Sequence, residues 1–442
     1  MRRLTSRAAL ALAPAALLIA ATLCRSACAQ PQQPLAATYA VVGAKAYTMT
    51  ASGPIENATI VIRDGRIAAI GSGLAPPADA EVIAANGRIV TPGLMNAGTQ
   101  LGLLEVSSVP DTADQAVSSG PLGAAFDVEF ALNPNSTLLP LARADGFSRA
   151  GVLPAAAANA PFAGIGAVLR LCEGPQILDL PRAMMFANVG GMAAASAGGS
   201  RSAQWILLRN ALEEAKRYRA VAHPSKPRDQ LLNHLDAEAL QPVVAGRMPL
   251  AVVAARESDI RQAVRLSDDF NVRVVVFGGA EAWRVAALLA AHSIPVVLDP
   301  FADLPWTFDE LGARLDNAAL LQRAGVVIAF TLPPIHLSHN AGSALREAAG
   351  LAVANGLPWI EALKALTLNP AHIWGIADHY GSLSPGKDAD LVIWDGDPLE
   401  PSSAPLQVWV RGRPASLETR QRLLRERYSP KQRSNPWPPE YR

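Results

Sequence analysis

The chain has few histidines and cysteines for its length. Its 442 residues include seven histidines and three cysteines. No histidine precedes His223, and none lies between His234 and His292. No aspartate lies between Asp316 and Asp378. These gaps exclude any site that needs a histidine or an aspartate from those stretches of the chain.

Charged and aromatic residues are also scarce. Charged residues make up 17% of the chain and aromatic residues 5%, whereas half of the residues are hydrophobic. This composition is typical of a globular protein with a large core. The chain as a whole has no excess of basic charge that would predict nucleic-acid binding. Locally, Arg411 to Arg442 contains nine Lys or Arg against three Glu, and we read residues 416–442 as a solvated, basic, proline-rich C-terminal tail.

Residues 1–29 have the features of a secretory signal peptide. Three arginines precede a stretch of about 16 apolar residues, Ala8 to Leu23, and Ala27-Cys28-Ala29 offers small residues for cleavage. The apolar stretch contains Pro14 and is short for a membrane span. We therefore expect an exported protein, periplasmic or secreted, with no membrane span after cleavage.

Removal of this segment changes two counts. Only Cys172 of the three cysteines remains, so no intramolecular disulfide can form. The segment contains four of the 39 basic residues and no acid, which leaves 35 basic against 38 acidic residues. The remaining chain is therefore close to neutral.

Short β-like segments lie towards both ends of the remaining chain. The first group precedes residue 93 and includes two runs joined by Asp64-Gly65, a strong hairpin signal. The runs are Tyr39–Val42, Thr59–Ile62, Arg66–Ile70, Leu391–Trp394 and Gln407–Val410. We expect residues 30–92 and 380–415 to form one small composite β-sandwich.

Residues 93–379 alternate between strand-like and helix-like segments, which predicts a parallel sheet. The regular repetition favours an α/β fold with a (β/α)8 TIM-like barrel. Residues 107–162 are rich in Pro, Gly, Ser and Ala, and we read them as long loops or an insertion over one barrel face. The expected strands are Gly166–Leu171, Leu250–Ala254, Val272–Phe277, Val296–Leu298 and Val326–Phe330, and the expected helices are Ser258–Phe270, Ala280–His292 and Phe308–Arg323.

Two distant stretches resemble the amidohydrolase superfamily. The first is Pro-Ile-Glu-Asn-Ala-Thr-Ile-Val-Ile-Arg-Asp-Gly-Arg-Ile at 54–67, continuing to Gly-Arg-Ile-Val-Thr-Pro-Gly-Leu at 87–94. The second is Ala-Leu-Lys-Ala-Leu-Thr-Leu-Asn-Pro-Ala at 362–371, followed by Gly-Ser-Leu-Ser-Pro-Gly-Lys-Asp-Ala-Asp-Leu-Val at 381–392. They occur in the family's order and are most similar to its imidazolonepropionase-like and prolidase-like group.

The resemblance implies a metal-centred barrel beside a composite β-sandwich. In the family, Thr-Pro-Gly-Leu leads into Asp-Ala-His-Thr-His, whose two histidines bind metal. Two further histidines end later strands, and an aspartate follows the eighth strand. Neutral imidazoles and a carboxylate hold a divalent ion that leaves one position open for water. The ion activates this water for hydrolysis of a C–N bond.

The sequence departs from this pattern at every expected histidine. Asn-Ala-Gly-Thr-Gln at 96–100 places Gly98 and Gln100 where the first two ligands are expected. Val253 and Gly278 occupy the expected positions of the next two. The strand-eight aspartate is absent as well. We therefore predict no bound cofactor.

A few other residues are candidates for chemistry at the barrel mouth. His336 and His339 follow the last expected strand and could share a metal, but no third ligand presents itself. Glu105 and Glu173 could act as acid or base, and Arg256 could bind an anionic ligand. Each also has a structural interpretation, as a loop residue bonded to backbone or a member of an ion pair.

The sequence favours a catalytically impaired member of the family. Such a protein could bind a small peptide-like ligand in the old cavity. It could also form a homo-oligomer, or a hetero-oligomer with an active homologue. The alternative is an active C–N bond hydrolase with an atypical site that holds zinc or another divalent metal. A third interpretation is metal-free chemistry in the same mouth.

Overall fold

The computed structural model describes residues 38–155, 161–218, 231–332 and 342–429. The predicted signal peptide, His336 and His339 lie outside these ranges, as does part of the basic tail. Within them, no helix is both long enough and apolar enough to span a membrane. The described residues form two sheets of eight strands each.

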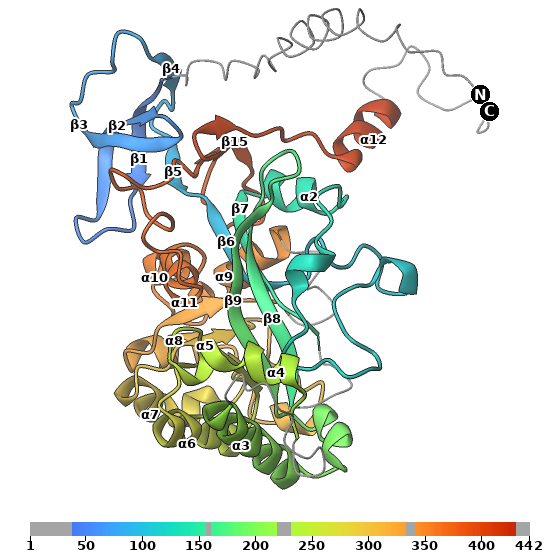
Figure 1. Ribbon diagram of the computed structural model, residues 1–442. Coiled ribbons are helices and arrows are strands. Elements are labelled where there is room, and N and C mark those ends of the chain that lie inside the picture. The colour runs from blue at the N-terminus through green and yellow to red at the C-terminus, as the bar shows by residue number, and fades with distance from the viewer. Residues whose placement is uncertain (1–37, 156–160, 219–230, 333–341, 430–442) are drawn as a thin grey trace, which may run out of the picture. The chain divides into compact units, whose positions relative to one another are not determined.

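The first sheet combines strands from both ends of the chain (Figure 1). Its order is β16-β15-β14-β5-β1-β2-β3, with β4 beside β1. The two ends meet where β5 pairs antiparallel with β14, so that Thr91 lies opposite Val392. The strands are β1 Tyr39–Tyr47, β2 Pro54–Arg63, β3 Arg66–Ser72, β4 Glu81–Ala84, β5 Ile89–Pro92, β14 Leu391–Trp394, β15 Pro405–Val410 and β16 Arg413–Pro414.

The predicted hairpin is present in this sheet. Asp64 and Gly65 join β2 to β3, and both have positive φ angles, 52° and 76°. Two such residues give the turn whose twist matches that of the flanking strands. Asp and Gly tolerate this conformation better than most residues, which explains why the dipeptide was informative.

The second sheet is a nearly closed barrel, so the predicted α/β fold class is confirmed. The strands follow chain order from β6 to β13. They are β6 Leu94–Thr99, β7 Phe147–Val152, β8 Phe162–Arg170, β9 Leu178–Asn188, β10 Leu250–Ala254, β11 Val274–Gly278, β12 Val296–Leu298 and β13 Ile328–Phe330. The first and last strands meet where the Thr331 hydroxyl donates to the Gly98 carbonyl at 2.7 Å.

The barrel differs from the expected parallel sheet at β8. This strand pairs antiparallel with both β7 and β9, whereas the other neighbours in the barrel sheet are parallel. Strand β8 is joined to β9 by residues 171–177 and not by a helical crossover. A short connection permits only antiparallel neighbours. The expected parallel role of Gly166–Leu171 was therefore wrong.

Residues 107–162, which we read as long loops or an insertion, also contain regular elements. This stretch contains helix α2 and barrel strand β7. The strand has an arginine, a serine and a glycine among its six buried residues, Phe147 to Val152. Its composition therefore lacks the continuous β-branched pattern that identifies buried strands.

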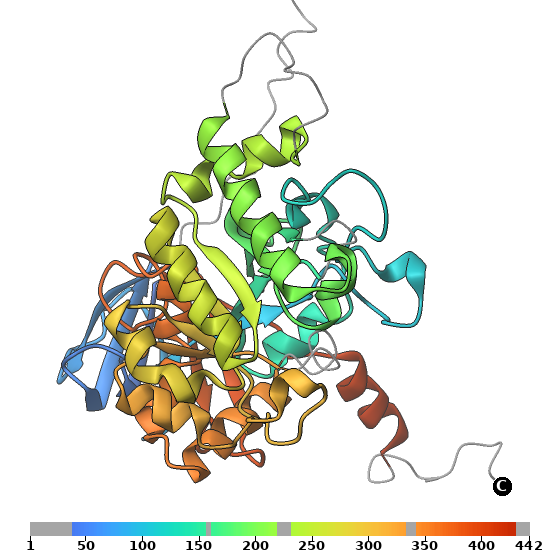
Figure 2. The ribbon, with the colours of Figure 1, turned by 90° about the horizontal axis from the view of Figure 1, so that it is seen from below.

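Helices lie outside the barrel strands (Figure 2). Helix α6 begins one residue earlier than predicted, with Arg256 as its N-cap. Predicted helix Ala280–His292 begins as a 3-10 turn, whereas predicted helix Phe308–Arg323 is not continuous, because its α-helix begins only at Asn317. The α-helices are α2 Leu139–Ala144, α3 Arg201–Arg217, α4 His234–Ala239, α5 Gln241–Val244, α6 Glu257–Phe270, α7 Ala286–Ala291, α8 Asn317–Arg323, α9 Ser343–Ala354, α10 Trp359–Lys364, α11 Leu368–Ile373 and α12 Arg420–Tyr428; the 3-10 turns are η1 Pro110–Thr112, η2 Val128–Ala131, η3 Met192–Ala197, η5 Ala282–Val285 and η6 Phe308–Glu310.

Apolar side chains fill the barrel interior. One buried cluster combines residues from seven barrel strands with Trp374, which follows α11. The Trp374 indole nitrogen donates to the Ala97 carbonyl at 2.9 Å. A Cβ at Gly151 would lie 2.3 Å from this indole, so the neighbouring strand accommodates it only as glycine. The interior below the mouth is thus a packed core.

A buried arginine joins the barrel to the first sheet. Arg149 of β7 contacts Asp179 at 2.8 Å, Asp388 at 3.0 Å and also Asp390, and its side chain is fully buried. Both Asp388 and Asp390 belong to the Lys-Asp-Ala-Asp motif that carries part of the family resemblance. In this chain these two acids of the motif hold the arginine of β7.

Candidate active site at the barrel mouth

The carboxyl ends of the parallel barrel strands form the end where this architecture carries its active sites. The pairing of neighbouring strands shows which residues lie at the same height at this end of the barrel. Ala254, Gly278, Leu298 and Phe330 lie side by side at the ends of β10, β11, β12 and β13. The residues that follow them in the chain therefore surround the opening.

Gly98 lies in a filled position at this end. The Asn96 side-chain oxygen accepts a hydrogen bond from the Gly98 N–H at 2.9 Å, at an irregularity between β6 and β7. A Cβ at Gly98 would lie 2.8 Å from the Thr331 hydroxyl, 3.0 Å from Leu153 Cδ2 and 3.3 Å from Phe277 Cε1. Neighbouring side chains thus occupy the space that a histidine would need.

The other three substituted positions also lie at the mouth. Val253 is 36% exposed and lies opposite Phe277, and Gly278 is the exposed last residue of β11. Gly278 has φ +93°, a conformation that L side chains rarely adopt. Gln100 is buried just after β6. Solvent therefore reaches the strand ends near Val253 and Gly278 but not the side chain of Gln100.

These residues do not fit the metal that the family implies. Two glycines and a valine supply no donor, and a glutamine supplies only a neutral amide oxygen. In the described parts of the chain, no group of three or more His, Cys, Asp or Glu is placed to hold a metal ion. The four positions therefore cannot form the histidine-based centre.

The other predicted candidate residues lie in different parts of the structure. Glu105 follows β6 and accepts hydrogen bonds from the backbone and hydroxyl of Thr137 at 3.1 and 3.0 Å; its second oxygen is buried without a partner. Glu173 does not lie at the mouth, because it follows the antiparallel strand β8. It accepts from the Ser416 N–H at 3.0 Å and contacts Arg143 at 3.8 Å.

Arg256 follows β10 at the mouth and is already paired. It contacts Asp259 at 3.1 Å and Asp309 at 3.7 Å. Arg201 contacts the same two acids, and the Gly191 N–H donates to Asp309 at 2.7 Å. Burial opposes ionisation of Asp309, but hydrogen bonds from Arg201 and Gly191 outweigh it and lower the pKa of this carboxyl. The cluster ties three loops together at this end.

One acid at the mouth was not among the predicted candidates. Asp299 directly follows β12, after Val296-Val297-Leu298. Burial raises the pKa of its carboxyl to about 6, the Phe301 N–H hydrogen bond opposes this rise, and the charge of Glu310 adds to it. A strand predicted to end at Leu298, followed at once by an acid, was the signal that could have identified Asp299.

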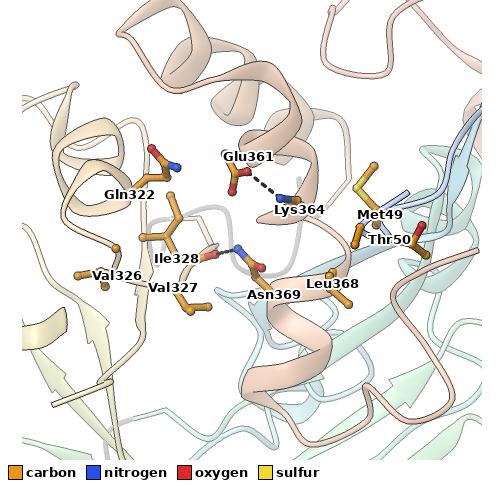
Figure 3. A pocket seen from close by; sticks show the side chains of 12 residues that line it. Met49, Thr50, Gln322, Val326, Val327, Ile328, Glu361, Lys364, Leu368 and Asn369 are labelled. Atoms are coloured by element: carbon orange, nitrogen blue, oxygen red, sulfur yellow. Dashed lines mark hydrogen bonds and ion pairs between the residues drawn. The ribbon is translucent and has the colours of Figure 1, made fainter. Parts of the chain in front are cut away.

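A separate pocket lies at the opposite end of β13 (Figure 3). It has a volume of about 360 Å³ and includes Val326 to Ile328, where that strand begins. The two charged residues in its wall, Glu361 and Lys364, pair with each other at 2.8 Å. The pocket is therefore distinct from the mouth and offers no unpaired charge to a ligand.

Comparison with known proteins supports a common family. Residues 311–415 match the amidohydrolase family. The chain is 26% identical over 385 residues to the amidohydrolase tasK of Hapsidospora irregularis, an alignment of 76% of this chain and 37% of that protein. It is 33% identical over 146 residues to the imidazolonepropionase of Shouchella clausii, covering 28% and 30% of the two chains. The alignments thus span about a third of each relative's length.

A solved structure is similar over nearly its whole length. The amidohydrolase from Thermotoga maritima superimposes with a TM-score of 0.76 at 24% identity, covering 86% of this chain and 99% of that one. This similarity shows the fold of both the barrel and the sheet built from the two chain ends. The chain therefore matches the amidohydrolase family at residues 311–415 and has the fold of a solved amidohydrolase structure.

Proposed function

We propose that this protein is an exported amidohydrolase-family barrel that has lost metal-dependent C–N bond hydrolysis and acts as a ligand-binding subunit. The observation that carries the proposal is the packing at Gly98. A first ligand could not be restored there without moving Thr331 and Leu153, since a Cβ would meet them at 2.8 and 3.0 Å. In the structure, neighbouring side chains fill the space beside Gly98.

The retained barrel supports a binding role. Its stability depends on packed strands and helices, whereas hydrolysis in the family depends on a few side chains that can be lost separately. The ends of β10 and β11 remain accessible to solvent at Val253 and Gly278. A mouth with apolar walls and a small number of polar groups is typical of small-molecule sites.

Metal analysis combined with turnover tests the proposal. We expect the purified protein, after signal removal, to contain no stoichiometric zinc, manganese or iron, and a chelator to leave its thermal unfolding unchanged. It should not release amine from dipeptides, from N-acyl amino acids or from cyclic amides. Tightly bound metal, together with turnover that a chelator abolishes, would overturn the proposal and establish an active hydrolase with an atypical site.

Association with another chain belongs to the same proposal. Self-association should appear as a mass above that of one chain in light scattering. A hetero-oligomer should contain an active homologue whose turnover changes when this subunit is added. A strictly monomeric protein with no effect on a homologue would remove the partner role and leave ligand binding alone.

A further inference from the structure

The Asp299 carboxylate is bonded by the described residues at one of its two oxygens. Its Oδ1 accepts a hydrogen bond from the Phe301 N–H at 2.9 Å. Its Oδ2 has no hydrogen bond or ion pair with any residue that the structure describes. The side chain is half-buried. A partly buried carboxylate that lacks a partner costs free energy, since little water remains to solvate its charge.

The contrast with Asp309 in the same β12–α8 connection shows that Asp299 is an exception. Asp309 is buried, but Arg201 and Arg256 lie at its side chain and the Gly191 N–H donates to it. Among the described residues, no arginine or lysine forms an ion pair with Asp299. The charge that acts on its carboxyl is that of Glu310, which has the same sign and raises its pKa.

Register places Asp299 among the substituted ligand positions. Leu298 lies between Gly278 and Phe330. Asp299 is therefore one residue beyond the strand end, at the same height as Thr331, which follows the neighbouring strand. Val297 belongs to the interior cluster. Because side chains alternate along a strand, position 299 continues this inward face.

Apolar residues lie near this level, together with the Thr331 hydroxyl, which bonds to the Gly98 carbonyl. Val253 is exposed at the end of β10, Phe277 packs edge-to-face on Phe186 with ring centroids 5.2 Å apart, and Leu153 lies beside Gly98. An apolar wall beside a carboxylate without a cation is suited to one ligand class. A protonated amine would neutralise the acid, and an attached hydrocarbon would contact the wall.

We propose that Asp299 is the ligand-binding acid of the mouth, and that the ligand is a small molecule with a protonated amine next to an apolar group. This inference rests on the proposed ligand-binding function and specifies its chemistry. Two other classes fit less well. An anion would meet the charges of both Asp299 and Glu310, and magnesium or calcium needs about six oxygen ligands, more than these acids supply.

Isothermal calorimetry on the mature protein tests the amine requirement. The probes are phenethylamine, isoamylamine and leucinamide, each compared with its N-acetylated form, which keeps the hydrocarbon and removes the charge. We expect at least one amine to bind at neutral pH at least about tenfold more tightly than its acetylated partner. Equal affinity within every pair, or no binding by any amine, would overturn the proposal.

Two variants locate the site. Asp299→Asn removes the charge and keeps an acceptor for the Phe301 N–H, and it should weaken amine binding at least about tenfold. Asp303→Asn removes an exposed acid of the same loop and should leave affinity within about twofold of the parent protein. Unchanged binding by a folded Asp299→Asn protein would place the site elsewhere and sink the assignment.

The two proposals can fail separately. Zinc-dependent amide hydrolysis with intact, Asp299-dependent amine binding would overturn the loss of catalysis but not the role of this acid. A metal-free, inactive protein that ignores amines would overturn the role of Asp299 and leave the proposed function standing.

Discussion

The Thr331 hydroxyl donates a hydrogen bond to the Gly98 carbonyl at 2.7 Å, which links the last barrel strand to the first. In the family, the ends of these two strands carry an acid and a pair of histidines around a metal. Here the end of β13 supplies a hydroxyl and the end of β6 a backbone carbonyl. A structural hydrogen bond thus lies where the resemblance leads one to expect coordination chemistry.

Gly98→His should destabilise the protein and should not create a zinc site. The new Cβ would meet Thr331 and Leu153 at 2.8 and 3.0 Å, and overpacking of this kind costs about 2 kcal/mol or more. Urea denaturation measures the change. Gly98→Ala is the matched control, with a smaller loss of about 1 kcal/mol. A Gly98→His protein with parental stability and bound zinc would show that the mouth retains the family's geometry.

Thr331→Val should weaken closure of the barrel. Valine keeps the shape of threonine but removes the hydroxyl that bonds to Gly98, so we expect a loss of about 1 kcal/mol in the free energy of unfolding. Thr331→Ser retains the hydroxyl and should keep the hydrogen bond. Denaturation of both variants in urea separates the two contributions. A larger loss for the serine variant would assign the role of Thr331 to its methyl group.

Asp299→Asn should stabilise the protein at neutral pH. The pKa of Asp299 is about 6 in the folded state against 3.8 for an ordinary aspartate. The folded state therefore holds this proton to higher pH, and stability falls as pH rises from about 4 to about 6. After a discount for partial exposure, asparagine should add roughly 2 kcal/mol at pH 7 and little at pH 4.

Urea denaturation at pH 4, 5, 6 and 7 measures this difference between Asp299→Asn and the parent protein. Asp303→Asn, which alters an exposed acid four residues later, is the control and should show no such trend. A stability difference that does not change with pH would mean that Asp299 titrates as an ordinary carboxyl.

Arg149→Met should be severely destabilising. It would leave Asp179, Asp388 and Asp390 together without the guanidinium that pairs with them, and removal of one partner from a buried ion network costs about 3–5 kcal/mol. Arg411→Gln is the control, because Arg411 is half exposed and contacts Asp388 at 3.7 Å; its loss should stay below about 1 kcal/mol. Thermal unfolding compares the two, and equal losses would contradict a dominant role for Arg149.

Much of the fold was predictable because local signals agreed with the tertiary structure. Asp64-Gly65 identifies a hairpin through its backbone preferences, and the apolar strands Leu250–Ala254 and Val296–Leu298 were predicted with the bounds that they have. Strand β7 was not predicted, since its central arginine is buried only by virtue of three distant aspartates. No local pattern can show such a pairing.

The candidate site was predictable in one respect only. Sequence identified which residue types were missing at Gly98, Gln100, Val253 and Gly278, because an absent side chain needs no coordinates to be noticed. Sequence did not identify the partners of Arg256, the position of Glu173 away from the mouth, or the exceptional state of Asp299. Each of these depends on contacts between residues far apart in the chain.

The sequence by itself therefore determined the family resemblance, the fold class and the lack of histidine at the expected ligand positions, since these follow from the order and identity of residues. Only the tertiary structure decided that Gly98 is closed by packing and that Asp299 keeps a carboxylate oxygen without a partner among the described residues. The reason is physical: the free energy of a side chain at the mouth depends on burial, charge and neighbours, which exist only after the strands have come together.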